Sequence, residues 1–214
     1  MRNTLFTIGH STHTLEYFVS LLTKHGIQAV SDVRSVPYSQ YNPQFNREPL
    51  MQRLRAADIE YVFLGKELGA RSENRACYVD GKVDYNYLAE EPAFVNGLRR
   101  LRKGIENFRV ALMCAERDPL TCHRTILVCR ELRSSDLEIE HILADGTVET
   151  NVAAEKRLMS MMNFRPDMFH SERDCIEQAY EKQANSIAYT ITARNPDPQH
   201  RDLPDEDLHN RLHQ

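Results

Sequence analysis

The sequence has no long apolar run, no export signal and no excess of basic residues. Its 214 residues are 41% hydrophobic and 27% charged, and no apolar stretch reaches the roughly 20 residues of a membrane-spanning helix. The N-terminal stretch MRNTLFTIGHS lacks the apolar core and small-residue cleavage site of a signal peptide. The formal net charge of −4 argues against a generally basic nucleic-acid-binding protein but allows a local basic patch. We therefore expect a cytoplasmic protein with no membrane partner.

The cysteines are odd in number, and a chain of this length forms a hydrophobic core without needing covalent cross-links. Without an export signal, the expectation is a reducing compartment and free thiols. The five are Cys77, Cys114, Cys122, Cys129 and Cys175.

Short apolar runs alternate with amphipathic segments along most of the chain. Strands are expected over 5–11, 27–37, 60–69, 108–114 and 137–146, and helices over 14–26, 49–59, 85–103, 118–133, 152–162 and 172–189. The alternation predicts an α/β fold with an open, mostly parallel sheet, helices on both faces, and C-terminal helices. We expect residues 1–192 to form a single α/β domain with a C-terminal helical extension. Residues 193–214 have little to bury and are expected to be a disordered tail.

Polar residues follow three of the expected strands, at the sheet edge where open α/β proteins bind ligands. These are Gly9-His10-Ser11, Asp32-Val33-Arg34-Ser35 and Cys114-Ala115-Glu116. A helix expected from Asp118, with Pro119 at its first position, would begin at the same edge and place Cys122, His123 and Arg124 in its first turns. The sequence thus predicts one site, with catalytic residues Cys114, Glu116, Cys122 and His123, and with substrate-binding residues His10, Ser11, Asp32, Arg34, Ser35 and Arg124.

The cysteines in this region also have an ordinary structural interpretation. Cys122 and Cys129 share a helical stripe with Ile126, so Cys122 is either a core residue or a thiolate favoured by a helix N-terminus. Cys129, deeper on the stripe, is expected in the core. Cys114 ends a strand on a loop, which favours a functional thiol.

The other candidate residues are also open to more than one interpretation. Arg34 and Arg124 suit an anionic group, but a lone arginine usually forms a surface ion pair. Asp32 either orients Arg34 or caps a turn, and Glu116 is either a general acid or base or a solvated side chain. His10 and His141 have no single assignable role. The stretch YSQYNPQF is a substrate lid, a stacking surface or a packed loop.

The same cysteines also allow two further interpretations. Cys114 and Cys122 could form a redox couple, or bind metal with His123 or His10, but their spacing matches no common zinc signature. The sequence therefore predicts no metal site and leaves any cofactor undefined.

Several motifs together resemble one bacterial family, called domain-of-unknown-function family 488. They are TIGHST, SDVRSVPYSQYNPQF, EYVFLGKELGA, LMCAERDPLTCHR and EIEHILADG, and IEQAYEKQANSIAY resembles the C-terminal segment of longer members. The likeness runs from about residue 5 to 190, with a departure at LGKELGA, where the family has a more glycine-rich loop. It implies an α/β fold with a Cys-Glu and Cys-His-Arg pattern, and no established reaction.

A second likeness concerns fold alone. SDVRSVPYS is similar to the Asp-Val-Arg strand end of rhodanese-like domains. The loop after Cys114 does not match theirs, because the arginine that closely follows their cysteine is replaced by Leu120.

The leading hypothesis is an enzyme with a thiol-centred site and an anionic substrate. Arg34 and Arg124 would hold the anion, Cys114 or Cys122 would be the nucleophile or redox thiol, and Glu116 or His123 would move protons. A competing hypothesis is a nucleic-acid-associated module, with arginines on phosphate and the aromatic loop stacking on bases. A third is a purely structural polar network. Reaction, substrate and oligomeric state stay open.

Overall fold

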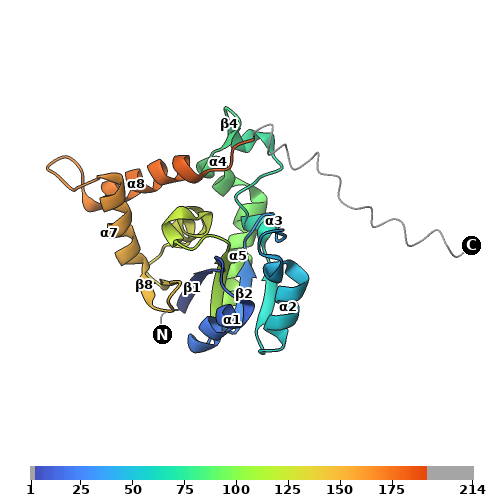
Figure 1. Ribbon diagram of the computed structural model, residues 1–214. Coiled ribbons are helices and arrows are strands. Elements are labelled where there is room, and N and C mark those ends of the chain that lie inside the picture. Colours follow the sequence, from blue (N-terminus) through green and yellow to red (C-terminus); the bar gives the residue numbers. More distant parts are fainter. Residues whose placement is uncertain (1–2, 192–214) are drawn as a thin grey trace, which may run out of the picture.

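A six-stranded sheet with helices on both faces forms the body of the protein (Figure 1). The computed structural model describes residues 3–191, so the expected tail over 193–214 lies outside the described residues. The strand order is β3-β2-β6-β1-β7-β8. All neighbouring strands are parallel except β7 and β8, which are antiparallel. The strands are β1 (Asn3–Gly9), β2 (Ala29–Asp32), β3 (Glu60–Phe63), β6 (Val110–Cys114), β7 (Leu137–Ile142) and β8 (Val148–Thr150).

The α-helices alternate with the strands and then continue at the C-terminus. They are α1 (Leu15–Lys24), α2 (Arg47–Arg55), α3 (Gly65–Leu68), α4 (Tyr85–Glu90), α5 (Pro92–Asn107), α6 (Arg130–Leu132), α7 (Asn151–Met162) and α8 (Glu172–Ile187). This arrangement confirms the predicted fold class. Among the described residues, no helix is both long and apolar enough to cross a membrane.

Alternate side chains of the buried strands face two separate halves of the core. Phe6 and Ile8 of β1 pack with α1 and α2 on one face. Leu5 packs on the other face, in the larger core that includes α5, α7 and α8. The sheet is therefore covered on both sides, as parallel sheets generally are.

Local sequence signals explain where α1 begins and ends. The side chain of Thr14 accepts a hydrogen bond from the Tyr17 N–H and caps the helix, as expected. Gly26 follows the helix with φ +63°, a conformation that glycine adopts without strain.

Several expected elements have different bounds. The strand expected over 27–37 ends at Asp32. The strand expected over 60–69 ends at Phe63, and α3 follows it. The helix expected over 85–103 is two helices, because Glu91 leaves the helical conformation directly before Pro92. The segment 70–84, for which no element is expected, contains a hairpin of β4 (Tyr78–Val79) and β5 (Lys82–Val83).

The helix expected over 118–133 is also interrupted, at Cys122. Asp118 does act as a cap, accepting the Leu120 N–H, but it caps only the short 3₁₀ turn η3 (Pro119–Thr121). The backbone at Cys122 is extended, with φ −132° and ψ 138°. A π-helix, η4 (Arg124–Cys129), follows and continues into α6. Cys122 therefore precedes the helical segment, and its placement in a first turn was wrong.

The C-terminal helices cover the carboxyl edge of the sheet. In Figure 1, α7 follows one side of the sheet and α8 crosses above the strand ends toward β4. The Gln183 side chain of α8 donates to the Leu120 carbonyl at 2.6 Å. The Val83 N–H donates to the Tyr189 carbonyl at 2.9 Å, which joins the end of α8 to the hairpin.

Candidate active site

A cavity of about 270 Å³ opens at the carboxyl edge, beneath the end of α8. Five of the predicted site residues line it, namely Arg34, Ser35, Cys114, Glu116 and His123. They come from the segments after β2 and β6 and from the start of the helical segment that includes η4. A larger cavity of about 500 Å³ lies between the β4–β5 hairpin and α8, and none of the predicted site residues line it.

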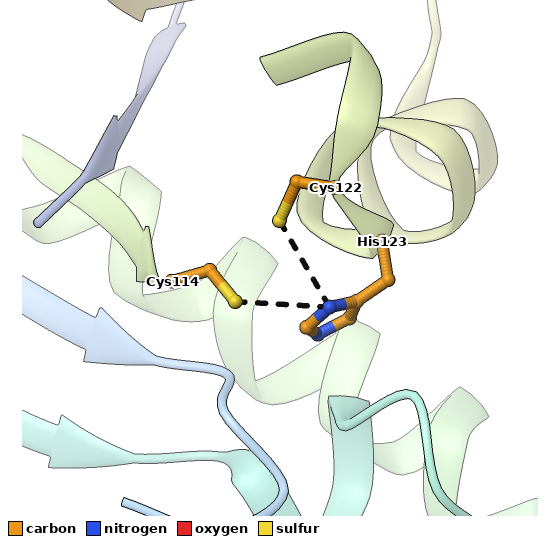
Figure 2. A group of neighbouring side chains, drawn as sticks. All are labelled: Cys114, Cys122 and His123. Carbon is orange, nitrogen blue, oxygen red and sulfur yellow. Dashed lines mark hydrogen bonds between the residues drawn. The ribbon is translucent and has the colours of Figure 1, made fainter. Parts of the chain in front are cut away.

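Cys114, Cys122 and His123 form a buried Cys–His cluster beside the smaller cavity. In Figure 2, both sulfur atoms point toward the imidazole ring. The distances to Nδ1 of His123 are 3.7 Å from Cys114 Sγ and 4.0 Å from Cys122 Sγ. Nε2 of His123 lies 2.9 Å from the Val33 carbonyl. A carbonyl only accepts, so Nε2 carries a proton and Nδ1 is the nitrogen that faces the sulfurs.

Cys122 is surrounded by groups that affect the pKa of its thiol. Its Sγ lies 2.9 Å from Oε2 of Glu116 and accepts the Arg124 backbone N–H at 3.4 Å. Burial alone would raise the pKa of Cys122, but the Cys114 thiol, the Arg124 guanidinium and His123 outweigh burial and hold that pKa well below its usual range. Burial, and then Cys122, raise the pKa of Glu116.

The two thiols therefore differ in pKa and in position. The hydrogen bond to Cys122, followed by burial, raises the pKa of Cys114 well above its usual range. Of the two, Cys122 is thus the thiol that loses its proton more readily. Only Cys114 of this pair lines the cavity, so the thiol that a bound molecule meets first is the one with the raised pKa.

Asp32 orients Arg34, which was one of the two roles considered for it. The carboxylate of Asp32 accepts from Nε of Arg34 at 2.9 Å and from its NH2 at 2.6 Å. The same NH2 also donates to the Phe45 carbonyl, and the Tyr61 hydroxyl donates to Asp32. These contacts fix the guanidinium at the cavity in one orientation.

Arg124 does not line the cavity. Its side chain is completely buried and donates to the Glu116 carbonyl at 2.8 Å and to the Arg117 carbonyl at 3.5 Å. It therefore holds the loop that follows β6. Its charge acts on the cavity indirectly, through the pKa of Cys122.

His10 and Ser11 lie behind Arg34 and also do not line the cavity. The His10 ring stacks on Phe45 with 4.3 Å between centroids. Burial, and then Arg34, lower the pKa of His10 to about 4. The Ser11 N–H donates to the Ala115 carbonyl at 2.9 Å, with φ +49°. Both residues support the loop after β6 from the neighbouring strand.

Gly9 allows this loop to cross the end of β1. A Cβ at position 9 would overlap the backbone carbonyl of Glu116. The glycine of the TIGHST motif is therefore required by close packing rather than by its own conformation.

Several residues that line the cavity are not among the predicted site residues. They include Arg71, Tyr85 and Tyr189, which come from the segment after α3, the start of α4 and the segment after α8. The Arg71 guanidinium lies 4.5 Å from the centre of the Tyr189 ring. Only the position of Arg71 directly after EYVFLGKELGA could have suggested it.

Two further expectations concern the surroundings of the site. Cys129 is fully buried, as expected for a core residue, and burial raises its pKa to about 12. The aromatic loop is partly packed, since Phe45 is buried and the Tyr38 hydroxyl donates to Glu48. Tyr41 is 93% exposed and is the most exposed aromatic residue of this loop.

A comparison with protein-family models matches residues 14–130 to a family described as Domain of unknown function DUF488. The match covers more than half of the chain and includes the Cys–His cluster, Glu116 and Arg34. Neither the curated proteins nor the solved structures gave a match.

Proposed function

The chain belongs to the family described as Domain of unknown function DUF488, and from the geometry of its site we propose that it is a thiol enzyme acting on a small molecule with an anionic group. One observation carries the proposal. The Cys114 thiol lines a cavity and lies 3.7 Å from Nδ1 of His123, the ring nitrogen that does not face the Val33 carbonyl. A thiol and a base within reach of each other, with the base oriented by a third group, are the parts of an activated nucleophile.

Each residue of the Cys–His cluster has its own role in this proposal. The Cys114 sulfur bonds to an electrophilic atom of the substrate while its proton passes to Nδ1 of His123. The bond to the leaving group then breaks, and the leaving group takes that proton. The negative charge on Cys122 stabilises the imidazolium formed in between, because Cys122 Sγ is 4.0 Å from the same nitrogen. The Val33 carbonyl keeps the ring in place throughout.

Glu116 is the second group suited to moving protons. Its raised pKa increases the protonated fraction near neutral pH relative to an ordinary glutamate. It lines the same cavity as Cys114. We assign it to the leaving group or to the water that releases the covalent intermediate.

The anionic group of the substrate is inferred from two arginines at the cavity. Arg34 is held rigidly by Asp32, and Arg71 lies against Tyr189. Both line the cavity with Cys114. Guanidinium groups are well suited to carboxylate and phosphate. The volume of about 270 Å³ is near the lower limit of small-molecule sites, about 300 Å³, and therefore favours a small substrate.

Thiol reactivity tests the proposal directly. Metal-free protein is treated with iodoacetamide at neutral pH, and the modified cysteines are identified by mass spectrometry over time. We expect Cys114 to react before Cys129 and Cys175, which are comparably buried but do not line the cavity. His123→Gln should slow the reaction of Cys114 at least about tenfold, because the base is lost.

A rate at Cys114 no faster than that of an unperturbed thiol would reject the nucleophile. A salt-dependent shift of oligonucleotides would then support the competing nucleic-acid hypothesis. If Cys114 reacts as fast in His123→Gln as in wild type, only the role assigned to the imidazole is rejected.

A further inference from the structure

The Cys–His cluster has the composition of a metal site as well as that of a nucleophile. We propose that Cys114, Cys122 and His123 bind one soft divalent cation of the zinc type. Their ligand atoms all lie within 4.8 Å of one another, and all three residues are buried. Thiolate and imidazole are the ligands that zinc prefers among protein side chains.

The separations fit a tetrahedral ion. Zinc–sulfur and zinc–nitrogen bonds of about 2.3 and 2.1 Å, meeting at the tetrahedral angle, place their outer atoms about 3.6 Å apart. The observed separations from Nδ1 are 3.7 Å to Cys114 Sγ and 4.0 Å to Cys122 Sγ. Only small side-chain movements would bring all three atoms onto one ion.

The surroundings already hold the histidine as a ligand is held. Histidines that bind metal generally donate their other ring N–H to a carbonyl or carboxylate, which fixes the tautomer. Nε2 of His123 lies 2.9 Å from the Val33 carbonyl, so Nδ1 presents its lone pair to the two sulfurs. The backbone also supports Cys122, whose Sγ accepts the Arg124 N–H.

The fourth position of the proposed site would face the cavity, which Cys114 lines. Oε2 of Glu116 lies 2.9 Å from Cys122 Sγ, and both Glu116 and Cys114 line the cavity. Three protein ligands with one position left for a carboxylate, water or substrate distinguish exchangeable and catalytic sites from closed structural ones. The proposed site is therefore open to solvent exchange through the cavity.

From the sequence, metal binding by Cys114 and Cys122 with His123 or His10 was an alternative that the spacing did not favour, because the ligands come from two elements. Cys114 ends β6, whereas Cys122 and His123 are adjacent residues before η4. Common zinc signatures instead rely on closely spaced pairs of ligands. Here the close approach of the ligands depends on the fold.

Metal binding goes beyond the proposed function and does not rest on it. A bound cation takes a lone pair from each sulfur, and any proton still on either thiol passes to solvent. Neither sulfur is then free to attack a substrate or an alkylating agent. Metal occupancy would therefore switch the thiol chemistry off.

A cobalt titration of chelator-treated wild-type protein tests the site, because bound Co²⁺ reports thiolate ligands through a charge-transfer absorption. We expect one Co²⁺ per chain, displaced by one equivalent of Zn²⁺. Cys114→Ser, Cys122→Ser and His123→Gln should each weaken binding at least about 100-fold, the upper end of the effect of losing an outer-shell partner. Cys175→Ser is the matched control and should bind like wild type, since Cys175 is buried in α8 and is not part of the Cys–His cluster.

Wild-type protein alone also decides the question if a variant fails to fold. Zinc should protect Cys114 from iodoacetamide, with the protected fraction following metal occupancy. The absence of a thiolate–cobalt band in folded wild-type protein, or a band unchanged in all three variants, would overturn the proposal. Fast alkylation of Cys114 without metal binding would reject the metal site and support the thiol enzyme. Metal binding by a cluster whose thiols do not react would support the metal site and reject the thiol enzyme.

Discussion

His141, which has no assignable role in the sequence, joins β1 to β7 and α7 in the folded protein. Its Nδ1 lies 2.8 Å from the Thr7 hydroxyl, and its Nε2 lies 3.1 Å from Oδ1 of Asn151. The Asn151 amide in turn donates to Glu155 at 2.9 Å. His141 is completely buried, and burial, followed by Arg124, lowers its pKa to about 4. A charged imidazole is therefore excluded from the native state at neutral pH.

This burial predicts a loss of stability in acid. The unfolded chain binds a proton at His141 near pH 6.5, whereas the native chain resists protonation until about pH 4. The contribution of His141 to the free energy of unfolding is therefore fully present above pH 6.5 and is lost as the pH falls toward 4. We expect the free energy of unfolding, measured with urea, to fall by about 2 kcal/mol less between pH 7 and 4.5 in His141→Asn than in wild type. The matched control is His170→Asn, because His170 is exposed. Parallel profiles for wild type and His141→Asn would contradict the assignment.

At the residue scale, the sequence could predict which side chains lie close together because the carboxyl ends of parallel strands meet. That rule brought Arg34, Cys114 and Glu116 to one cavity, although they are far apart in sequence. It could not locate Arg124, because a guanidinium near a helix start can equally bind backbone carbonyls, as it does here. Nor could it identify Arg71, whose position depends on the turn after α3.

Among the elements, η4 is the one whose geometry departs most from expectation. A π-helix is wider than an α-helix and is rarely stable without a functional or packing reason. Within it, the Thr125 hydroxyl is buried and, among the residues described, has no hydrogen-bond partner. An unsatisfied buried hydroxyl costs free energy that a methyl group in its place would not.

Replacing this hydroxyl is expected to stabilise the protein. Thr125→Val keeps the shape of the side chain and should raise the free energy of unfolding by about 1 kcal/mol in urea. Thr23→Val, at an exposed position of α1 where the hydroxyl donates to the Val19 carbonyl, should change it by less than about 0.5 kcal/mol. Lower stability for Thr125→Val would mean that the hydroxyl has a partner, such as a buried water.

At this scale, the sequence predicted the existence of elements better than their limits. Thr14 and Gly26 mark α1 correctly, because capping depends on nearby residues. The break at Cys122 could not be predicted, since Asp118 and Pro119 are equally good signals for a 3₁₀ turn and for a helix. Tertiary contacts of Cys122 decide between the two.

For the whole molecule, the C-terminal helices contribute to the core although the family match ends at residue 130. Helix α8 buries Cys175, Ala179 and Tyr180, and Gln183 bonds to the turn before Cys122. We expect a chain ending at Asn163 to lose cooperative thermal unfolding, because this apolar surface and the Leu120 carbonyl would be uncovered. A chain ending at Ile191 is the control and should melt within a few degrees of the full sequence. A cooperative transition in the shorter chain would instead indicate that α8 is a separate unit.

The buried contact between Thr7 and His141 also limits how the strands can align. In the native register Thr7 of β1 lies opposite His141 of β7. A slip of two residues would keep every apolar side chain on its proper face but would set Ile139 or Leu143 opposite Thr7. His141 would then be buried without its partner hydroxyl. A two-residue slip, which hydrophobic burial alone would tolerate, therefore costs free energy, so this polar contact helps a folding chain to select a single alignment.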